Sequence, residues 1–355
     1  MLSFINRLRT IGPKRFFYIN NNRPRPAILD DPVYGEHKFF KVKDDVRIHY
    51  VDSGRSINHR PIIFFLHGFP ECWFSWRFQL KEFGKEYRTI AVSLRGYGDS
   101  DKPTDLSAYS ITILIDDCYE LIQHITKDME KIILIGHDWG GLISWYFSML
   151  YPELIEKLII INASHPAIFI KHIRNDWQQF WQSWFIFFFQ LPWLPELMFR
   201  SEDMEILTKM FYPYVRLAEE IDVYKYYFQT FNDCRCPFNY YRAFIRGYGH
   251  REFLKRLYQS KRTFDHDKIE STTLIIWSGQ NINTTDMGIV PSLAKQSATL
   301  CRESTLKFID NGSHWIIFEK PDEINQIIRE FLNNIIDADD DDYEIDDRRK
   351  SCKIS

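Results

Sequence analysis

The stretch KIILIGHDWGG, residues 131–141, decides how this sequence folds. Its first part, KIILI, is a β-branched apolar run typical of a buried strand, and LISWYFSML at 142–150 predicts a helix. A turn bounded by glycines, from Gly136 to Gly141, lies between them. Strand, sharp turn and helix form the setting of a nucleophile elbow, which presents one side chain at the edge of a sheet. The residue at the elbow position is Asp138.

An aspartate at the elbow predicts a particular chemistry. A serine there would form acyl enzymes, whereas a carboxylate attacks an alkyl carbon and forms an alkyl ester on itself. The substrates would then be strained or activated C–O or C–halogen electrophiles. The helix that follows keeps Asp138 ionised through its N-terminal dipole. The alternative, an aspartate that only caps this helix, is common but does not account for the glycine frame around it.

On both sides of the elbow, apolar runs alternate with helical patterns. We expect strands at residues 37–42, 46–51, 61–66, 87–92, 131–135, 157–161, 272–277 and 305–309. This alternation predicts an α/β fold with a mostly parallel sheet covered on both faces. Between 167 and 258 the alternation stops, and aromatic-rich helical patterns replace it. We therefore expect a helical lid inserted after the sixth strand.

The chain divides accordingly into a basic leader (1–30), a core (31–166 and 259–336), a helical cap (167–258) and an acidic, disordered tail (337–355). The cap contains an aromatic run too dense for one amphipathic face, so we expect it to be buried against the core or to line an apolar cavity. This run comprises Phe180, Trp181, Trp184, Phe185, Phe187, Phe188, Phe189 and Trp193.

Composition excludes several classes of partner. A net charge of −3 over 355 residues gives no support for nucleic-acid binding. Of six cysteines only Cys234 and Cys236 are close together, which is a weak zinc signal, so we expect no metal and no cofactor. Free thiols predict a reducing compartment, the cytoplasm. The leader is interpreted either as unstructured or as an amphipathic anchor at a membrane surface, such as that of the endoplasmic reticulum.

Two further segments supply candidate catalytic groups. The sequence HGFP, residues 67–70, follows the third strand, where a turn supplies a backbone N–H to an oxyanion hole. The two donors would be the amides of Phe69 and of Trp139, the residue after the nucleophile. His314 follows the last strand and is the candidate base that activates water for ester hydrolysis.

The acid that should orient this histidine is harder to find. We expect it just after the strand at 272–277, where Asn281 stands in place of a carboxylate. An amide there holds the wrong tautomer and does not stabilise imidazolium. Asp286, five residues on, is the alternative acid. No carboxylate follows the strand at 157–161 either, because that stretch continues as Asn162, Ala163, Ser164 and His165.

From residue 37 to 332 the chain resembles the epoxide hydrolases of the α/β-hydrolase superfamily. The matching motifs are HGFPECWFSW (67–76), RGYGDS (95–100), GHDWGG (136–141), YKYYFQ (224–229), NYYR (239–242) and GSHW (312–315). The lid sequence FFFQLPWLPELMF, residues 187–199, is most similar to the branch of types three and four.

The resemblance implies an eight-stranded α/β-hydrolase fold and a two-step hydrolysis of epoxides to vicinal diols. Asp138 would open the ring, and two lid tyrosines, Tyr224 and Tyr241, would donate to the epoxide oxygen. Trp139 and Trp315 would contact the substrate. A phenol is a far better acid than water for an alkoxide leaving group. The aromatic lid favours a lipophilic small molecule, such as a fatty-acid epoxide.

Two other functions stay open at this point. A haloalkane dehalogenase shares the aspartate elbow and the adjacent tryptophan, although a halide needs no proton from a tyrosine. A lipid-binding protein with impaired turnover would account for Asn281. A serine esterase is not expected, because Asp138 replaces the serine.

Overall fold

A central sheet organises the chain. The computed structural model describes residues 2–54, 61–126, 131–175, 177–215, 218–260, 268–279 and 290–334. Eight strands lie in the order β1-β2-β4-β3-β5-β6-β7-β8. They are β1 (Glu36–Lys41), β2 (Arg47–Asp52), β3 (Ile62–Leu66), β4 (Thr89–Val92), β5 (Ile132–His137), β6 (Ile155–Ile161), β7 (Thr272–Ser278) and β8 (Ser304–Ile309). Only the pairings of β2 with β1 and with β4 are antiparallel, so the expected mostly parallel sheet is confirmed.

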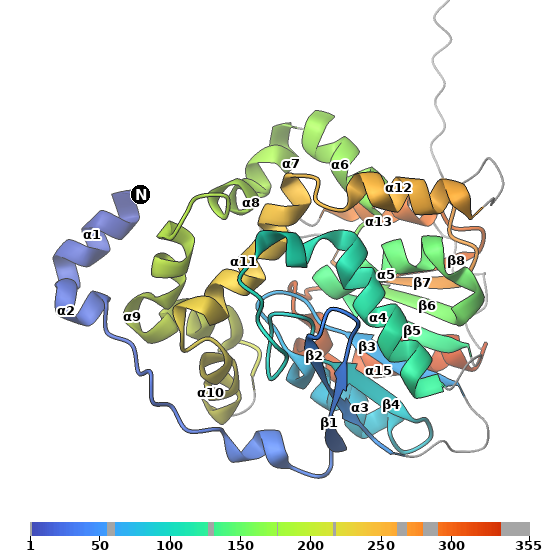
Figure 1. Ribbon diagram of the computed structural model, residues 1–355, viewed down its shortest axis with the longest axis horizontal. Helices are drawn as coiled ribbons and strands as arrows, with labels where there is room; N and C mark the ends of the chain where they lie inside the picture. The colour runs from blue at the N-terminus through green and yellow to red at the C-terminus, as the bar shows by residue number, and fades with distance from the viewer. Residues whose placement is uncertain are drawn as a thin grey trace, which may run out of the picture.

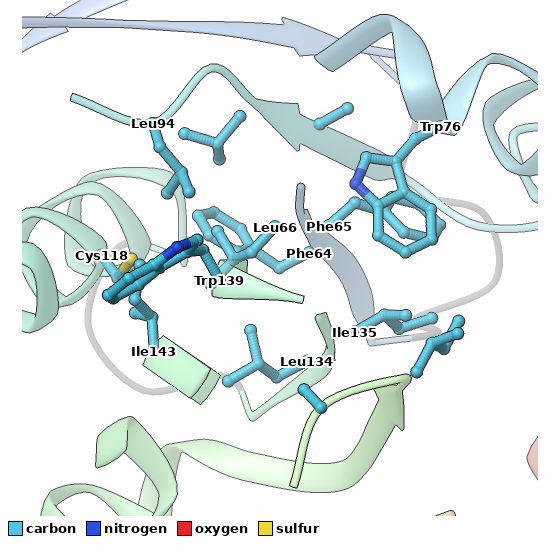
Figure 2. Close-up of a cluster of buried hydrophobic side chains, with 14 of the residues drawn as sticks. Phe64, Phe65, Leu66, Trp76, Leu94, Cys118, Leu134, Ile135, Trp139 and Ile143 are labelled. Atoms are coloured by element: carbon cyan, nitrogen blue, oxygen red, sulfur yellow. The ribbon is translucent and has the colours of Figure 1, made fainter. Parts of the chain in front are cut away.

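The central strands are buried on both faces because their side chains alternate between two apolar layers. Phe65 of β3 packs on Trp76 with ring centroids 4.9 Å apart. Figure 2 shows Leu134 on the side of Ile143, whereas Phe65 lies with Trp76 on the other side of the strands. Parallel strands covered in this way are continuous apolar runs, which is why β3 and β5 were recognisable from sequence.

Helices cover both faces of this sheet (Figure 1). Two of them, α4 (Ile111–Thr126) and α5 (Trp139–Leu150), pack together on one face, and α3 (Arg77–Phe83) packs with α15 (Pro321–Leu332) on the other. At the end of the sheet α13 (Pro291–Ala298) packs on β7 and β8, while α14 (Ile316–Glu319) packs against α15 and residues 73–76. The predicted doubly wound arrangement is therefore confirmed.

The inserted helices follow β6, as expected. They are α6 (Pro166–Asn175), α7 (Trp177–Gln182), α8 (Trp184–Phe188), α9 (Leu194–Phe211), α10 (Ala218–Tyr227), α11 (Phe231–Ile245) and α12 (His250–Gln259). Backbone angles at residues 201–204 interrupt α9. Most of these helices form a layer over the carboxyl ends of the strands, where the elbow lies (Figure 1).

The leader packs against this lid. Its helices α1 (Leu2–Ile11) and α2 (Pro13–Phe16) lie beside α9 (Figure 1). Arg7 forms an ion pair with Glu202 at 2.7 Å, and the amide of Asp203 donates to the carbonyl of Tyr18 at 2.9 Å. Within the described residues, no helix is long and apolar enough to cross a bilayer. The acidic tail lies outside the described residues.

The aromatic run departs from the expectation of burial. Ile186 is buried and Phe185 lines a cavity, but Trp181 and Trp184 expose 57% and 58% of their surface. The density of apolar residues predicted that both sides of α8 would be covered. In the structure one side is covered and the opposite side is exposed.

Candidate active site

The elbow holds Asp138 in a backbone conformation that few residues adopt. Its φ of 50° and ψ of −115° turn the chain sharply between β5 and α5. A non-glycine residue at positive φ stores strain that the surrounding structure must hold. Gly68 makes the close approach possible, because a Cβ there would lie 2.5 Å from the Cβ of Asp138 and 2.7 Å from its Oδ1. The carboxylate is therefore fixed in place by neighbouring backbone.

Two groups contact this carboxylate. The Phe69 amide donates to Oδ1 at 2.8 Å, and Nε2 of His314 lies 3.4 Å from Oδ2. Burial alone would raise the pKa of Asp138, but His314, His137 and the Phe69 amide together lower it below its usual value. The carboxylate is thus ionised and available as a nucleophile at neutral pH. The amide of Trp139, the other expected donor, begins α5 beside it.

His314 is held through its backbone. Its carbonyl accepts a hydrogen bond from Nδ2 of Asn162 at 2.9 Å and lies 2.8 Å from Nε2 of His137. Asn162 also accepts from the amide of Ser278 at 2.8 Å, so it connects the ends of β6 and β7 to the histidine loop. Sequence reasoning noted Asn162 only as a missing carboxylate. Its position at the end of a central strand was the available signal.

A buried ion pair lies behind the nucleophile. One carboxylate oxygen of Glu71 accepts from the amide of Gly68 at 2.7 Å and lies 3.1 Å from Nδ1 of His137. Both side chains are fully buried. Burial would lower the pKa of His137, but the charge and hydrogen bond of Glu71 overcome this and raise it. The pair connects three parts of the site: the turn at residues 67–70, the elbow and the carbonyl of His314. Sequence reasoning did not identify it.

The nucleophile faces an apolar pocket of about 90 Å³. Tyr241 lines it from the lid, and burial followed by the charge of Asp138 raises the pKa of its phenol well above the usual value. This hydroxyl therefore stays protonated and can donate. The remaining lining residues are Trp139, Leu142, Asn162, Ala163, Ser164, Phe169, Phe185, Ile186, Phe244, Trp277 and Leu293, with Asp138 and His314 at the base.

Two expected substrate-contacting residues lie elsewhere. The hydroxyl of Tyr224 is 3.1 Å from that of Ser75, and its ring packs on Phe211. Trp315 packs against Phe211 as well, with centroids 5.4 Å apart. Neither is among the residues that line the pocket. The structure therefore brings Asp138, His314, Tyr241, Phe69 and Trp139 together but leaves Tyr224 and Trp315 outside the pocket. Tyr224 was expected there from its motif position, where Tyr226 and Tyr227 lie close enough to leave the register uncertain.

The two neighbours of Tyr241 in the NYYR motif have structural roles. Tyr240 donates to the carbonyl of Arg95 at 2.6 Å. Arg242 donates to the carbonyls of Phe189 and Leu191, both at 2.8 Å, and pairs with Glu196 at 2.7 Å. The motif thus ties the lid turn between α8 and α9 to the helix that carries Tyr241.

Asn281 and Asp286, the two candidates at the acid position, lie outside the described residues. Nδ1 of His314 is buried and has no hydrogen-bond partner among the residues that the structure describes. This nitrogen is the one that an orienting acid would contact when Nε2 faces the nucleophile.

One cluster has the spacing of metal ligands but another explanation. His37, His49 and Asp99 bring three ligand atoms within 4.8 Å of one another. Hydrogen bonds already occupy the histidine nitrogens. Nε2 of His37 lies 2.8 Å from the Leu29 carbonyl, Nδ1 of His37 lies 2.8 Å from Nε2 of His49, and Nδ1 of His49 lies 3.0 Å from the Ser93 hydroxyl. Asp99 accepts hydrogen bonds from the Tyr227 hydroxyl and from a guanidinium.

Cys234 and Cys236 are free, and burial raises the pKa of both thiols.

Comparison with known proteins gives a consistent result. Residues 61–321 match the alpha/beta hydrolase fold family. Human epoxide hydrolase 4 is 33% identical over 332 residues, covering 90% of this chain and 85% of that protein. Epoxide hydrolase 3 of Xenopus tropicalis is 33% identical, covering 92% and 86%. A variant of an epoxide hydrolase from Bacillus megaterium, solved with its naphthyloxy-propanediol product, is 27% identical with a TM-score of 0.69, covering 83% of this chain and all of that one.

Proposed function

Since the chain belongs to the epoxide hydrolases of the α/β-hydrolase superfamily, we propose that it converts lipophilic epoxides to vicinal diols through a covalent ester on Asp138. The observation that carries this proposal is that an ionised Asp138 carboxylate and the Tyr241 phenol line the same apolar pocket. A nucleophile and a proton donor in one small cavity match the two needs of epoxide opening.

In the first step, an Asp138 oxygen attacks an epoxide carbon and the C–O bond of the ring breaks. The electron pair goes to the epoxide oxygen, which takes the proton of Tyr241. The product is a hydroxyalkyl ester. In this account Tyr241 acts as the lid's proton donor, because Tyr224 is hydrogen bonded to Ser75 outside the pocket.

In the second step, His314 removes a proton from water, and the resulting hydroxide attacks the carbonyl carbon of the ester. The amides of Phe69 and Trp139 hold the negative oxygen. The bond from the carbonyl carbon to the alkyl oxygen then breaks, and the leaving alkoxide takes the proton that the hydroxide brought to the Asp138 carboxyl group. This transfer releases the diol and restores the Asp138 carboxylate, while His314 returns its own proton to Tyr241. We propose Asp286 as the acid that stabilises the imidazolium, with Asn281 in the usual acid position as the reason to test it.

The pocket supports an apolar substrate, and we propose a fatty-acid epoxide. Six of its fourteen lining residues are phenylalanine, tyrosine or tryptophan, so aromatic rings form much of its wall. The bacterial relative with a naphthyloxy-propanediol product accepts a bulky aromatic group. The free, buried cysteines support a reducing compartment, and the basic leader supports contact with a membrane surface.

Diol formation from a panel of fatty-acid and aromatic epoxides tests the proposal, with Asp138→Ala as the control. Wild-type protein should form diol and the variant none. Halide release from a bromoalkane without diol from any epoxide would instead identify a dehalogenase, and diol formation by Asp138→Ala would refute the ester mechanism.

The role of Asp286 is tested separately by mass spectrometry of the intact protein during turnover. If Asp286 is the acid, Asp286→Ala should accumulate protein that carries one substrate mass, because ester hydrolysis slows while alkylation continues. Unchanged diol formation by this variant would exclude Asp286. Accumulation of the ester in the wild-type protein would mean that turnover is limited by Asn281.

A further inference from the structure

The outward side of the lid carries an unusual number of exposed tryptophans. Trp177, Trp181 and Trp184 expose 71%, 57% and 58% of their surface, and Phe187 exposes 38%. We call these four residues the lid aromatic face. They are spaced four, three and three residues apart across α7 and α8, which keeps them on one side of consecutive helical turns. Exposed aromatic groups of this size mark an interaction surface.

The sequence around this face excludes charge. Residues 177–195 contain no Asp, Glu, Lys or Arg, and the polar residues among them are three glutamines near the tryptophans, a fourth glutamine and a serine. Surfaces that contact water normally carry charged side chains. Tryptophan with uncharged polar neighbours is instead typical of the interface between lipid headgroups and acyl chains.

Basic residues precede the charge-free segment, which lies in the sequence between Asp176 and Glu196. Lys171 and Arg174 are exposed in the last part of α6, just before it. On the leader, which packs on α9, Arg9, Lys14 and Arg15 are exposed. Positive charge beside an apolar face is complementary to a surface of anionic lipid.

A second cavity lies between this face and the catalytic pocket. It has a volume of about 280 Å³ and lies between α6, α8, α11 and α12. It shares two wall residues, Phe169 and Phe244, with the catalytic pocket. Phe187 of the lid aromatic face and the basic Arg174 line it as well. The catalytic pocket alone, at about 90 Å³, is small for a long acyl chain, so the larger cavity offers room for the rest of it.

We propose that the lid aromatic face docks on an anionic lipid bilayer and that substrate enters from the lipid through the 280 Å³ cavity. Trp177, Trp181 and Trp184 insert among the headgroups, while Lys171 and Arg174 contact lipid phosphate. Docking stands independently of the chemistry at Asp138, whereas delivery of substrate rests on the proposed function.

Sedimentation of the full chain with vesicles tests the docking. Vesicles of phosphatidylcholine with and without phosphatidylserine should both bind the protein, the anionic ones more tightly. Trp181→Gln/Trp184→Gln should weaken binding at least about tenfold, since each tryptophan loses its apolar burial. The matched control is Tyr258→Gln, which removes an aromatic side chain that is 79% exposed on α12 and should bind like wild type. A third variant, Arg9→Gln/Lys14→Gln/Arg15→Gln, separates the leader from the lid.

Failure to bind either vesicle would overturn the proposal, as would wild-type binding by the tryptophan variant. Loss of binding only in the leader variant would place contact on the leader instead, and concentration-dependent self-association of wild type without vesicle binding would assign the face to a second copy. Activity separates docking from chemistry: the tryptophan variant should keep wild-type turnover of a water-soluble epoxide, but turn over a vesicle-embedded epoxide more slowly. If the tryptophan variant turned over both substrates at the wild-type rate, lipid delivery would be refuted while the proposed function remained intact.

Discussion

Replacement of Tyr241 by phenylalanine removes the phenol that shares the catalytic pocket with Asp138, while keeping the ring and its contacts. Burial and the nearby carboxylate hold the pKa of this phenol above its usual value, so it is protonated and donates at every pH at which the protein works. General acid catalysis of this kind contributes about 10²–10⁴-fold. With about 1.36 kcal/mol for each factor of ten, Tyr241→Phe should raise the barrier to ring opening by about 3–5 kcal/mol.

The structure offers two matched controls for this variant. Tyr240→Phe removes a hydroxyl that donates to the carbonyl of Arg95. It should cost about 1–3 kcal/mol of folding free energy, because a buried acceptor loses its partner, but little of the rate. Tyr224→Phe removes a hydroxyl that contacts Ser75 outside the pocket and should also leave the rate within about twofold of wild type.

The assay is single-turnover alkylation of Asp138, followed by mass spectrometry of the protein, with unfolding by denaturant measured on the same samples. Slow alkylation in Tyr241→Phe with unchanged stability supports the assignment. Equal losses in Tyr241→Phe and Tyr224→Phe would refute the reasoning, because it assigns the proton to Tyr241, which lines the pocket, and not to Tyr224, which does not.

Three further predictions concern the groups behind the nucleophile and in the lid. His314→Gln should alkylate but not hydrolyse, so that intact protein gains one substrate mass, and diol release at the wild-type rate would contradict its role as base. Glu71→Gln should destabilise the protein most at low pH: the raised pKa of His137 gives a stabilisation that is complete below about pH 6.5 and is lost as the pH rises through the raised value. Denaturant unfolding from pH 5 to 9 should therefore show that the difference in free energy of unfolding between wild type and Glu71→Gln becomes smaller as the pH rises. A difference that grows with pH would contradict the pairing of Glu71 with a protonated His137. Arg242→Met should lower the free energy of unfolding by about 3–5 kcal/mol, since it leaves Glu196 buried without its partner, and a loss below about 1 kcal/mol would contradict this.

The sheet and the elbow were predictable because each depends on a local pattern. Residues 131–141 contain a continuous apolar run, a turn that needs glycine and an apolar helix, and no distant contact is required to recognise them. His314 and Phe69 followed from their places after strands whose carboxyl ends meet at the same edge of the sheet. These are the residues that the structure brings to Asp138.

Other parts of the site depend on which side of a helix faces the core. Tyr240 and Tyr241 are adjacent, yet one binds a backbone carbonyl of the core and the other lines the pocket, because consecutive helical residues point about 100° apart. Tyr224 was expected in the site from its motif position, but its hydroxyl contacts Ser75 instead. The interactions of Glu71 with His137, and of Asn162 with His314, join residues far apart in the chain, which a local pattern does not reveal.

The central claim is that Asp138 becomes covalently attached to the substrate, and the fate of water oxygen tests it most directly. A single turnover in heavy-oxygen water, with enzyme in excess over epoxide, is followed by digestion and mass analysis of the peptide that contains Asp138. The account predicts a heavy oxygen in the Asp138 carboxylate and a diol without it, because water attacks the carbonyl carbon of the ester. Heavy oxygen in the diol and none in Asp138 would mean that water opens the epoxide directly, and would contradict the account.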